Sequence, residues 1–268
     1  MTDLPNTIAV DLKLSDEWLT ISFNQPEKRN ALTEELTSDI RNVLSSIKND
    51  HSIRGISMRG EGGVFCAGGD LKSFKSSFQG GEQVIDDIYK ASAMTGEFFD
   101  MINSFPKPVI MLAEGAAMAG GLGLLCTGDI VVVTKDCKFA LTETTLGIPP
   151  AQIAPFVTDR IGLSKARKIM LTAARFTGEE AFKIGLADFL ADDASDLMNI
   201  ENEIKKGVLK CAPKANAVTK EIVLATRYLS RKEMINFAAK GFSEQMLSDE
   251  GMEGIASFIE KRKPKWSK

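Results

Sequence analysis

Two glycine-rich segments constrain the fold of this chain more than any other feature of its sequence. Residues 64–72 contain Gly68 and Gly69, and residues 114–123 contain Gly120 and continue into an apolar stretch with helical spacing. Because glycine has no Cβ, two such turns can bring two backbone N–H groups to one point. A pair of N–H groups aimed at one point is what an oxyanion hole for a thioester carbonyl needs.

A purely structural interpretation of the same glycines also stands. Glycine at a strand–helix turn allows the two elements to pack closely, and one glycine-rich turn is a weak signal for a binding site. The GxGxxG pattern is absent. No strand–turn–helix unit with a following acidic residue opens the chain, so a dinucleotide-binding fold is not favoured.

A glutamate follows the short apolar run at residues 139–141. Glu143 could be a surface or packing residue at the end of a strand, but together with two oxyanion donors it suggests enolate chemistry on an acyl thioester. In an apolar acyl pocket, desolvation would raise its pKa and suit it to proton transfer near neutral pH.

Composition narrows the function classes. The chain has 268 residues, 26% of them charged, a net charge of −3 and a single histidine. The charge gives no reason to expect nucleic acid or an anionic membrane as the main partner. One histidine makes a Ser-His-Asp triad and a multi-histidine zinc centre unlikely candidates. Four cysteines without a CxxC pair, together with no signal peptide and no membrane-length apolar run, predict a cytoplasmic protein with reduced thiols.

The hydrophobic pattern predicts an α/β first half and a helical second half. We expect strands at 7–14, 18–24, 53–59, 109–113, 130–133 and near 139, and helices at 33–48, 81–104 and from about 120. Further helices are expected at 151–161, 164–173, 178–185, 193–210, 213–228 and 231–248. The basic tail, residues 261–268, is expected to be a solvated charged segment or a contact for an anionic ligand.

Several segments resemble, in order and spacing, the motifs of the crotonase (enoyl-CoA hydratase/isomerase) superfamily. They are NQPEKRNAL at 24–32, FCAGGDL at 65–71, AGG at 119–121 with CTGDI at 126–130, FALTE at 139–143 with LGIP at 146–149, and TGEEA at 177–181 with GLA at 185–187. The resemblance covers essentially the whole chain. It implies a crotonase (ClpP-like) spiral of ββα repeats at residues 1–195 and a C-terminal helical trimerisation region at 196–268. It further implies a homotrimer or homohexamer.

The resemblance also implies roles for particular residues. The N–H groups of Gly69 and Gly120 would hold the thioester oxygen, and Glu143 would be the catalytic acid–base group. Coenzyme A, which enters as part of the acyl-CoA substrate, would contact Lys28, Arg29, Ala31, Cys66, Ala67, Gly68, Asp70, Leu71 and Lys72. Lys72 and the basic tail of a neighbouring subunit would face its phosphates, although each lysine could equally be an ordinary surface charge. No metal and no redox cofactor is implied.

One position departs from the two-glutamate hydratases of this family. They carry a second carboxylate where this chain has Gly123, so Glu143 alone remains at a family catalytic position. A single glutamate is also what family enoyl-CoA isomerases use, and on this ground alone Gly123 favours an isomerase. Another acyl-CoA lyase or a hydrolase stays open, as does a catalytically idle CoA-binding subunit of the same fold.

The segment at residues 143–156 favours a hydratase. It resembles the corresponding segment of bacterial methylglutaconyl-CoA and isohexenylglutaconyl-CoA hydratases, which also tend to have glycine in place of the first glutamate. Their branched substrates carry a free carboxylate, which a cation should meet. Arg160 and Lys75 are candidates for that cation, with an ordinary surface charge as the alternative for each. The expected function is therefore hydration of a branched, glutaconyl-type enoyl-CoA.

Overall fold

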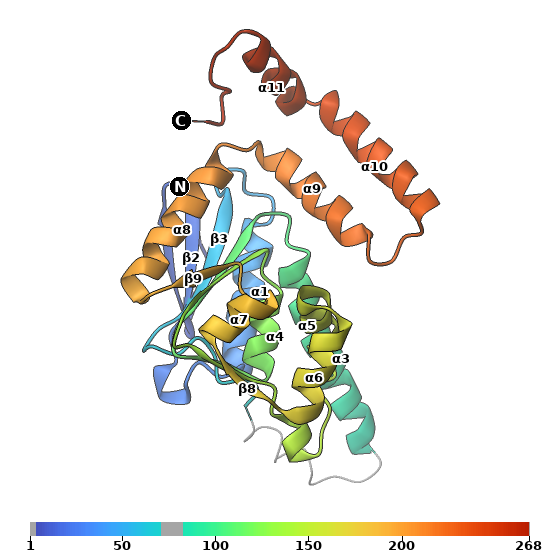
Figure 1. The fold of residues 1–268 in the computed structure, drawn as a ribbon. Coiled ribbons are helices and arrows are strands. Elements are labelled where there is room, and N and C mark those ends of the chain that lie inside the picture. Colours follow the sequence, from blue (N-terminus) through green and yellow to red (C-terminus); the bar gives the residue numbers. More distant parts are fainter. Residues whose placement is uncertain (1–3, 71–82, 268) are drawn as a thin grey trace.

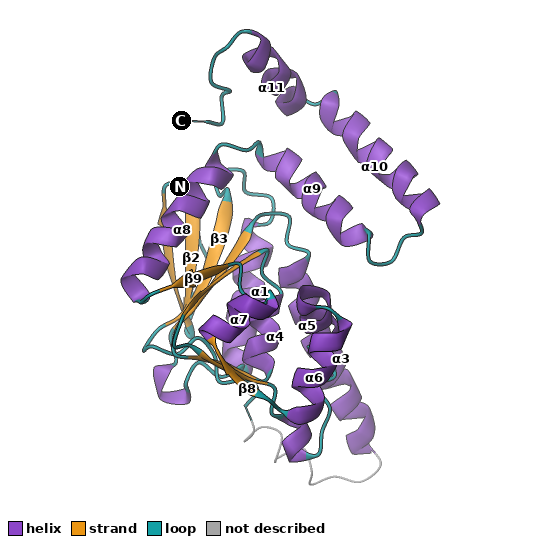
Figure 2. Cartoon of the chain, in the orientation of Figure 1, coloured by secondary structure: helices purple, strands orange, loops and turns teal. Residues whose placement is uncertain are grey.

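Two β-sheets form the centre of the computed structural model, which describes residues 4–70 and 83–267. The larger sheet has the strand order β1-β2-β3-β4-β6-β9 and the smaller one the order β5-β7-β8. Helices surround the sheets (Figures 1 and 2). The larger sheet contains β1 (Val10–Ser15), β2 (Trp18–Phe23), β3 (Gly55–Gly60), β4 (Val109–Ala113), β6 (Ile130–Thr134) and β9 (Phe189–Ala191). The smaller contains β5 (Ala116–Met118), β7 (Lys138–Ala140) and β8 (Arg175–Thr177). The chain thus passes from sheet to sheet, β4 to β5 and β6 to β7, as the expected spiral of ββα units requires.

The larger sheet is parallel except at its first hairpin. β1 and β2 pair antiparallel with Ser15 opposite Trp18, and the intervening Asp16 and Glu17 have φ of 51° and 63°. Positive φ at both turn residues is the type I′ geometry that matches the twist of a two-residue hairpin. The other pairs, β2 with β3, β3 with β4, β4 with β6 and β6 with β9, are parallel.

Both faces of the larger sheet are covered, and β4 is apolar throughout because both of its faces are buried. Its Ile110 and Leu112 pack in a cluster with α8 (Ala194–Leu209), whereas Met111 points into the main core on the opposite face. That core is built with α1 (Glu34–Ile47), α3 (Gln83–Asn103), α4 (Gly120–Cys126) and α5 (Ala154–Ile161), followed along the chain by α6 (Leu163–Thr172) and α7 (Gly178–Ile184).

The expected strands and helices are present in the described part of the chain, together with four strands or α-helices that the sequence pattern missed. Three are strands of three residues, β5, β8 and β9, which are too short for a period of two to be recognised. The fourth is α11 (Asp249–Ile259), which begins anew after Ser248 accepts a hydrogen bond from the Gly251 amide. A serine N-cap of this kind marks the start of a separate helix. The spiral fold expected from the family resemblance is confirmed by this arrangement.

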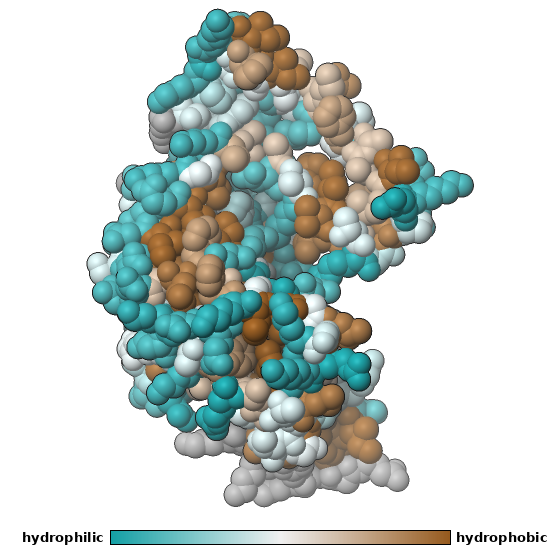
Figure 3. Space-filling model, in the orientation of Figure 1, coloured by the Kyte–Doolittle hydropathy of each residue, from teal (hydrophilic) through white to brown (hydrophobic). Residues whose placement is uncertain are grey.

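Beyond α8, the helices α9 (Pro213–Ala225), α10 (Arg231–Met246) and α11 extend away from the sheets as an arm (Figure 1). Apolar side chains lie on the visible surface of this arm (Figure 3), and Ile235, Phe242 and Phe258 are 66%, 68% and 86% exposed. A single chain therefore leaves the apolar surface of the arm uncovered.

The basic tail is not a free solvated segment. Its Arg262 is paired with Glu253 of α11 at 2.6 Å, and the carbonyl of Trp266 accepts a hydrogen bond from the buried Arg54 at 3.2 Å. The same guanidinium donates to the carbonyl of Cys211 at 2.6 Å, just after α8. Arg54 thus ties the end of the chain to the start of β3. No helix within the described residues is both long and apolar enough to cross a bilayer.

Candidate active site

The two glycine-rich segments lie against each other. The amide of Cys66 donates to Ala116 at 3.1 Å, and the amide of Met118 donates to Cys66 at 3.0 Å. A Cβ on Gly68 would lie 2.8 Å from the Met118 carbonyl oxygen, and a Cβ on Gly121 only 2.3 Å from that of Cys66. Both positions therefore require glycine, because any side chain would separate the segments.

This contact brings Gly69 and Gly120 side by side. A Cβ built on Gly120 would be 3.5 Å from the amide nitrogen of Gly69. Gly120 is the first residue of α4, where a helix leaves its N–H groups without an intrahelical acceptor and carries partial positive charge. Neither amide donates to another described residue. The structure thus leaves two neighbouring backbone amides, those of Gly69 and Gly120, without an acceptor among the described residues, as an oxyanion hole would require.

The backbone of Ala119, within the second glycine segment, is strained. Ala119, the N-cap of α4, has φ 49° and ψ −122°, a combination that residues with a Cβ rarely adopt. Its amide donates to the carbonyl of Ala140 at the end of β7, at 2.8 Å. The pairing of β5 with β7 fixes this turn, because Met118 lies opposite Ala140 in the ladder. Such strain persists where the surrounding structure enforces it, and it is often found at functional sites.

Glu143 follows directly from the same ladder. It begins a short 3-10 helix, η2 (Glu143–Leu146), three residues after Ala140. Its side chain is half-buried, and its Oε2 atom is buried without a hydrogen-bond partner. Desolvation raises the pKa of this carboxyl above 4.5, and a hydrogen bond from its own backbone only partly opposes the rise. A carboxyl with these properties is suited to take up and return a proton.

The predicted coenzyme A segments are brought together beside Gly68 and Gly69. The amide of Leu32 donates to Gly68 at 2.8 Å and the amide of Ala67 donates to Arg29 at 3.0 Å, so the loop containing Lys28, Arg29 and Ala31 lies along residues 67–69. Lys28 is exposed and pairs with Glu35 at 3.3 Å. Asp70 ends the described part of this segment. Leu71, Lys72 and Lys75 lie outside the described residues.

Cys66 has a supporting place in this arrangement. Its side chain is fully buried, and burial raises the pKa of the thiol to about 12. Its amide and carbonyl are both used in the contact with the second glycine segment. Cys66 therefore holds the two segments together, with its thiol facing the core.

Sequence reasoning missed Asn30, which organises the loop. Asn30 is fully buried with φ 51°; its side-chain amide donates to the carbonyls of Glu61 at 2.9 Å and Val64 at 2.7 Å, and its Oδ1 accepts from the Gln25 amide. Asparagine tolerates positive φ and carries both donors and an acceptor. The available signal was an asparagine inside a loop of turn-forming residues.

Arg160 is not placed to meet a substrate carboxylate, and that expectation is wrong. Its guanidinium donates to the carbonyls of Leu186 at 2.5 Å and Gly128 at 3.0 Å, and pairs with Asp188. The side chain is only 12% exposed, so it is not an ordinary surface charge either. Arg160 near the end of α5 thus joins that helix to the segment that leads into β9.

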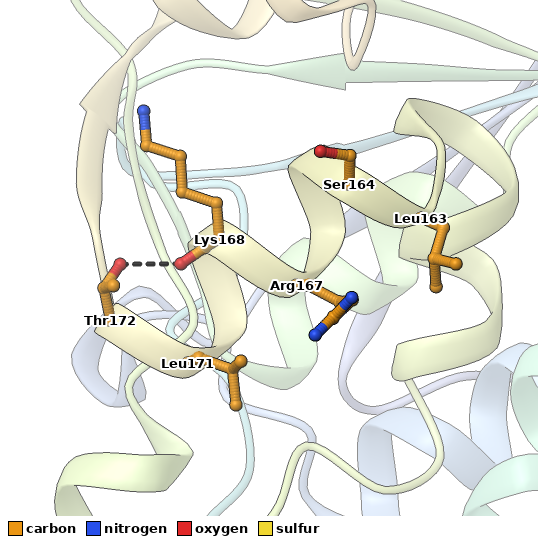
Figure 4. Close-up of a pocket in the computed structure, with 6 residues that line it drawn as sticks. All are labelled: Leu163, Ser164, Arg167, Lys168, Leu171 and Thr172. Carbon is orange, nitrogen blue, oxygen red and sulfur yellow. Dashed lines mark hydrogen bonds between the residues drawn. The ribbon is translucent and has the colours of Figure 1, made fainter.

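A depression on the surface of α6 offers no catalytic groups. It has a volume of about 470 Å³ and is lined by residues of this one helix: Leu163, Ser164, Arg167, Lys168, Leu171 and Thr172. In Figure 4, Arg167 and Lys168 point in different directions, and the Thr172 hydroxyl donates to the backbone carbonyl of Lys168. No group of three or more histidine, cysteine or acidic side chains in the described part of the chain could hold a metal ion.

Comparisons with known proteins agree with this geometry. The family model for enoyl-CoA hydratase/isomerase matches residues 15–268. The solved structure of Pseudomonas aeruginosa AtuE has a TM-score of 0.92 and 38% identity, covering 97% of this chain and 100% of that one. The carnitinyl-CoA dehydratase of Proteus mirabilis is 30% identical over 92% of this chain and 94% of its own length. A peroxisomal Δ(3,5)-Δ(2,4)-dienoyl-CoA isomerase of Arabidopsis thaliana is 29% identical over 92% and 91%.

The matched region includes both glycine segments, Glu143 and the helical arm. Only the residues before residue 15 lie outside the match. The chain therefore belongs to the enoyl-CoA hydratase/isomerase family of crotonase-fold enzymes.

Proposed function

We propose that this enzyme is a hydratase that adds water across the α,β double bond of an acyl-CoA thioester, with a branched glutaconyl-type acyl group as its substrate. One observation carries the proposal: the half-buried Glu143, with an unpartnered carboxylate oxygen, follows the strand that fixes the turn at Ala119 in the second glycine segment. A proton-transfer group and two oxyanion donors are then held by the same short ladder.

The reaction follows from these groups. The N–H groups of Gly69 and Gly120 bind the thioester oxygen and stabilise the negative charge that develops there. Ionised Glu143 takes a proton from water while the water oxygen bonds to the β-carbon, and the π electrons of the double bond move into an enolate. Glu143 then returns the proton to the α-carbon. The net change is addition of one water molecule, and the carboxylate is regenerated.

The choice of a hydratase rests on the residues around Glu143. Residues 143–156 resemble the corresponding segment of glutaconyl-type hydratases, and these also tend to have glycine where this chain has Gly123. An enoyl-CoA isomerase is the second candidate, because one carboxylate can also move a proton from the α- to the γ-position or back without water. The names of the relatives include both a dehydratase and an isomerase. An idle CoA-binding subunit is less well supported, because Glu143 has the raised pKa that acid–base work needs.

We further propose a cytoplasmic homotrimer or homohexamer that needs no metal or redox cofactor. The exposed apolar residues of α10 and α11, among them Phe242 and Phe258, support assembly through the helical arm. Coenzyme A enters only as part of the substrate. The loop at residues 28–31 and the segment at residues 66–72 are proposed to bind it.

Incubation with three thioesters in ¹⁸O-labelled water tests the function. Methylglutaconyl-CoA, isohexenylglutaconyl-CoA and crotonyl-CoA are followed by mass spectrometry with the wild type, with Glu143→Gln and with Glu179→Gln. Glu179 is an exposed helix glutamate and serves as the matched control. We expect the wild type to incorporate ¹⁸O into the product. The rate of incorporation should fall about 10²–10⁴-fold in E143Q and stay unchanged in E179Q.

Absence of label with every thioester would refute the hydratase for these acyl groups. A β,γ-enoyl-CoA whose double bond migrates without label would then identify an isomerase. Binding of CoA thioesters without any turnover would identify the idle subunit.

A further inference from the structure

Gly123 has a neighbour that excludes any side chain. It is buried in α4, three residues after Gly120, so the two glycines lie on the same side of this helix. A Cβ on Gly123 would lie 2.1 Å from Cγ2 and 2.4 Å from Cβ of Ile153. Two carbon atoms pack at about 3.5–4.0 Å, so a side chain at residue 123 and the present position of Ile153 cannot coexist.

Ile153 is held firmly where it stands. It is 4% exposed, belongs to the main core and is the N-cap residue of α5. Its backbone carbonyl accepts from the Val157 amide at 3.1 Å, within the first turn of the helix. The first turn of α5 therefore fixes its backbone, and the surrounding core encloses its side chain.

The preceding residue is fixed in the same way against another helix. A Cβ on Gly96 of α3 would lie 2.3 Å from Oε1 of Gln152, and the Gln152 side chain donates to the Ser92 hydroxyl at 3.0 Å. Two consecutive side chains thus enter two glycine notches, one on α3 and one on α4. The segment that follows η2 and Glu143 is thereby pinned to the helix that carries the oxyanion glycine.

We propose that Ile153 determines the substrate specificity of this site: its side chain fills the space that a side chain at residue 123 would use, and it forms an apolar wall on the face of α4 that carries Gly120. The inference rests on the proposed enoyl-CoA function and deepens it. α4 then supplies the oxyanion donor and no carboxylate, because residue 123 is a glycine and Ile153 occupies the space beside it.

The steric part is tested by thermal unfolding of Gly123→Ala, Ile153→Ala and the double variant. We expect G123A to lower Tm by about 4 °C or more, because it overpacks the contact. I153A also lowers Tm, because it leaves a cavity. The Tm of the double variant should fall by clearly less than the sum of the two single decreases, because the new methyl group enters the vacated space.

Gly207→Ala is the matched control. Gly207 lies exposed in α8, where a Cβ would meet nothing within 4 Å, so this change should not lower Tm. A G123A variant as stable as G207A, or losses that simply add, would overturn the steric pairing of Gly123 with Ile153.

The specificity part is tested by binding of two saturated thioesters, butyryl-CoA and 3-methylglutaryl-CoA, which need no turnover. We expect I153A to shift the ratio of their Kd values about tenfold or more toward the branched group, as one or a few removed methyl groups do in an apolar pocket. An unchanged ratio would overturn the role of Ile153 in specificity. Because neither measurement uses hydration, a wild type that fails to incorporate label would refute the proposed function without deciding this inference.

The double variant Gly123→Glu with Ile153→Ala adds a readout that a packing role alone would not move. Where hydration is observed, the pH profile of kcat/KM should gain one further ionisation relative to wild type. The single variant G123E should instead be strongly destabilised by its contact with Ile153. If the double variant folds but keeps the wild-type pH profile, the side chain at residue 123 does not face the acyl site.

Discussion

The amide of Ala119 donates to the carbonyl of Ala140 at 2.8 Å, and this hydrogen bond links the two halves of the candidate site. Ala119 precedes Gly120, the proposed oxyanion residue, whereas Ala140 lies three residues before Glu143. The parallel pairing of β5 with β7 extends this contact into a ladder. The position of the carboxylate relative to the oxyanion donors is therefore set by strand register, which is more rigid than a loop contact.

The strained backbone of Ala119 leads to the first prediction. Ala119→Gly should raise or preserve Tm with activity retained, because glycine adopts φ 49° without steric cost. Ala119→Val should lower the free energy of unfolding by about 1–3 kcal/mol and reduce activity, because a β-branched residue is disfavoured at positive φ. Thermal unfolding and enoyl-CoA turnover measure both. Equal behaviour of the two variants would show that the strain at residue 119 is absent in solution.

The raised pKa of Glu143 leads to the second prediction, on activity. As a general base Glu143 must be ionised, so kcat/KM should rise with pH and its acid limb should have a midpoint above 4.5. The midpoint is measured from pH profiles of kcat/KM, one recorded at low salt and one at high salt. A midpoint at or below 4.5 would contradict a desolvated carboxyl in the active enzyme.

The same shift predicts how stability depends on pH. Because the folded-state pKa of Glu143 is above the unfolded one, the protonated carboxyl contributes stability that is complete below about pH 4.5. This contribution is lost as pH rises through the folded-state pKa. The E143Q variant lacks it, so the difference in Tm between E143Q and wild type should increase in favour of E143Q over this pH range. A difference independent of pH would mean that burial leaves the pKa unshifted.

Much of this fold could be predicted from the sequence, because long amphipathic or apolar segments carry a clear pattern. The strand at residues 109–113 was predicted with its observed bounds, and α1 was predicted to within a residue at either end. The short strand β5 was missed, although it carries the ladder to Glu143. Three residues cannot display a period, so their pairing is set by the partner strand and not by their own sequence.

Residues of the candidate site could be predicted where the backbone requires a particular residue type. Residues whose role depends on long-range contacts were missed. Glycine at residue 68 could be recognised, because its φ is +98° and a Cβ there would lie 2.8 Å from the Met118 carbonyl oxygen. The environments of Asn30, Arg160 and Ile153 depend on residues 20 or more positions away in the chain, which no local pattern reveals. Arg160 was misjudged for this reason.

Arg54 is predicted to hold the helical arm and the tail to the core. Its guanidinium is buried and donates to the carbonyls of Cys211 and Trp266. Arg54→Ala should lower the free energy of unfolding by about 2–4 kcal/mol, because the charge-assisted hydrogen bonds from its guanidinium to the carbonyls of Leu209, Cys211 and Trp266 are lost. The tail should then become sensitive to limited proteolysis, detected as loss of C-terminal residues by mass spectrometry. Arg231→Ala, on the exposed surface at the start of α10, is the control. If the tail stays protected from proteolysis in R54A, Arg54 does not hold the tail to the core.

Asn30 is predicted to act on substrate binding through the loop at residues 28–31. Asn30→Ala removes both donors to Glu61 and Val64, so the loop should lose its fixed course past residues 67–69. We expect Tm to fall, with a loss of about 1–3 kcal/mol for the unsatisfied carbonyls, and KM for acyl-CoA to rise more than kcat falls. Asn24→Ala is the matched control, because Asn24 is exposed and its side chain bonds only the exposed Asp11. Asn30→Asp sharpens the test, since a carboxylate keeps the shape but cannot donate and should be as harmful as alanine. An N30A variant with unchanged KM would separate this loop from coenzyme A binding, whatever its stability.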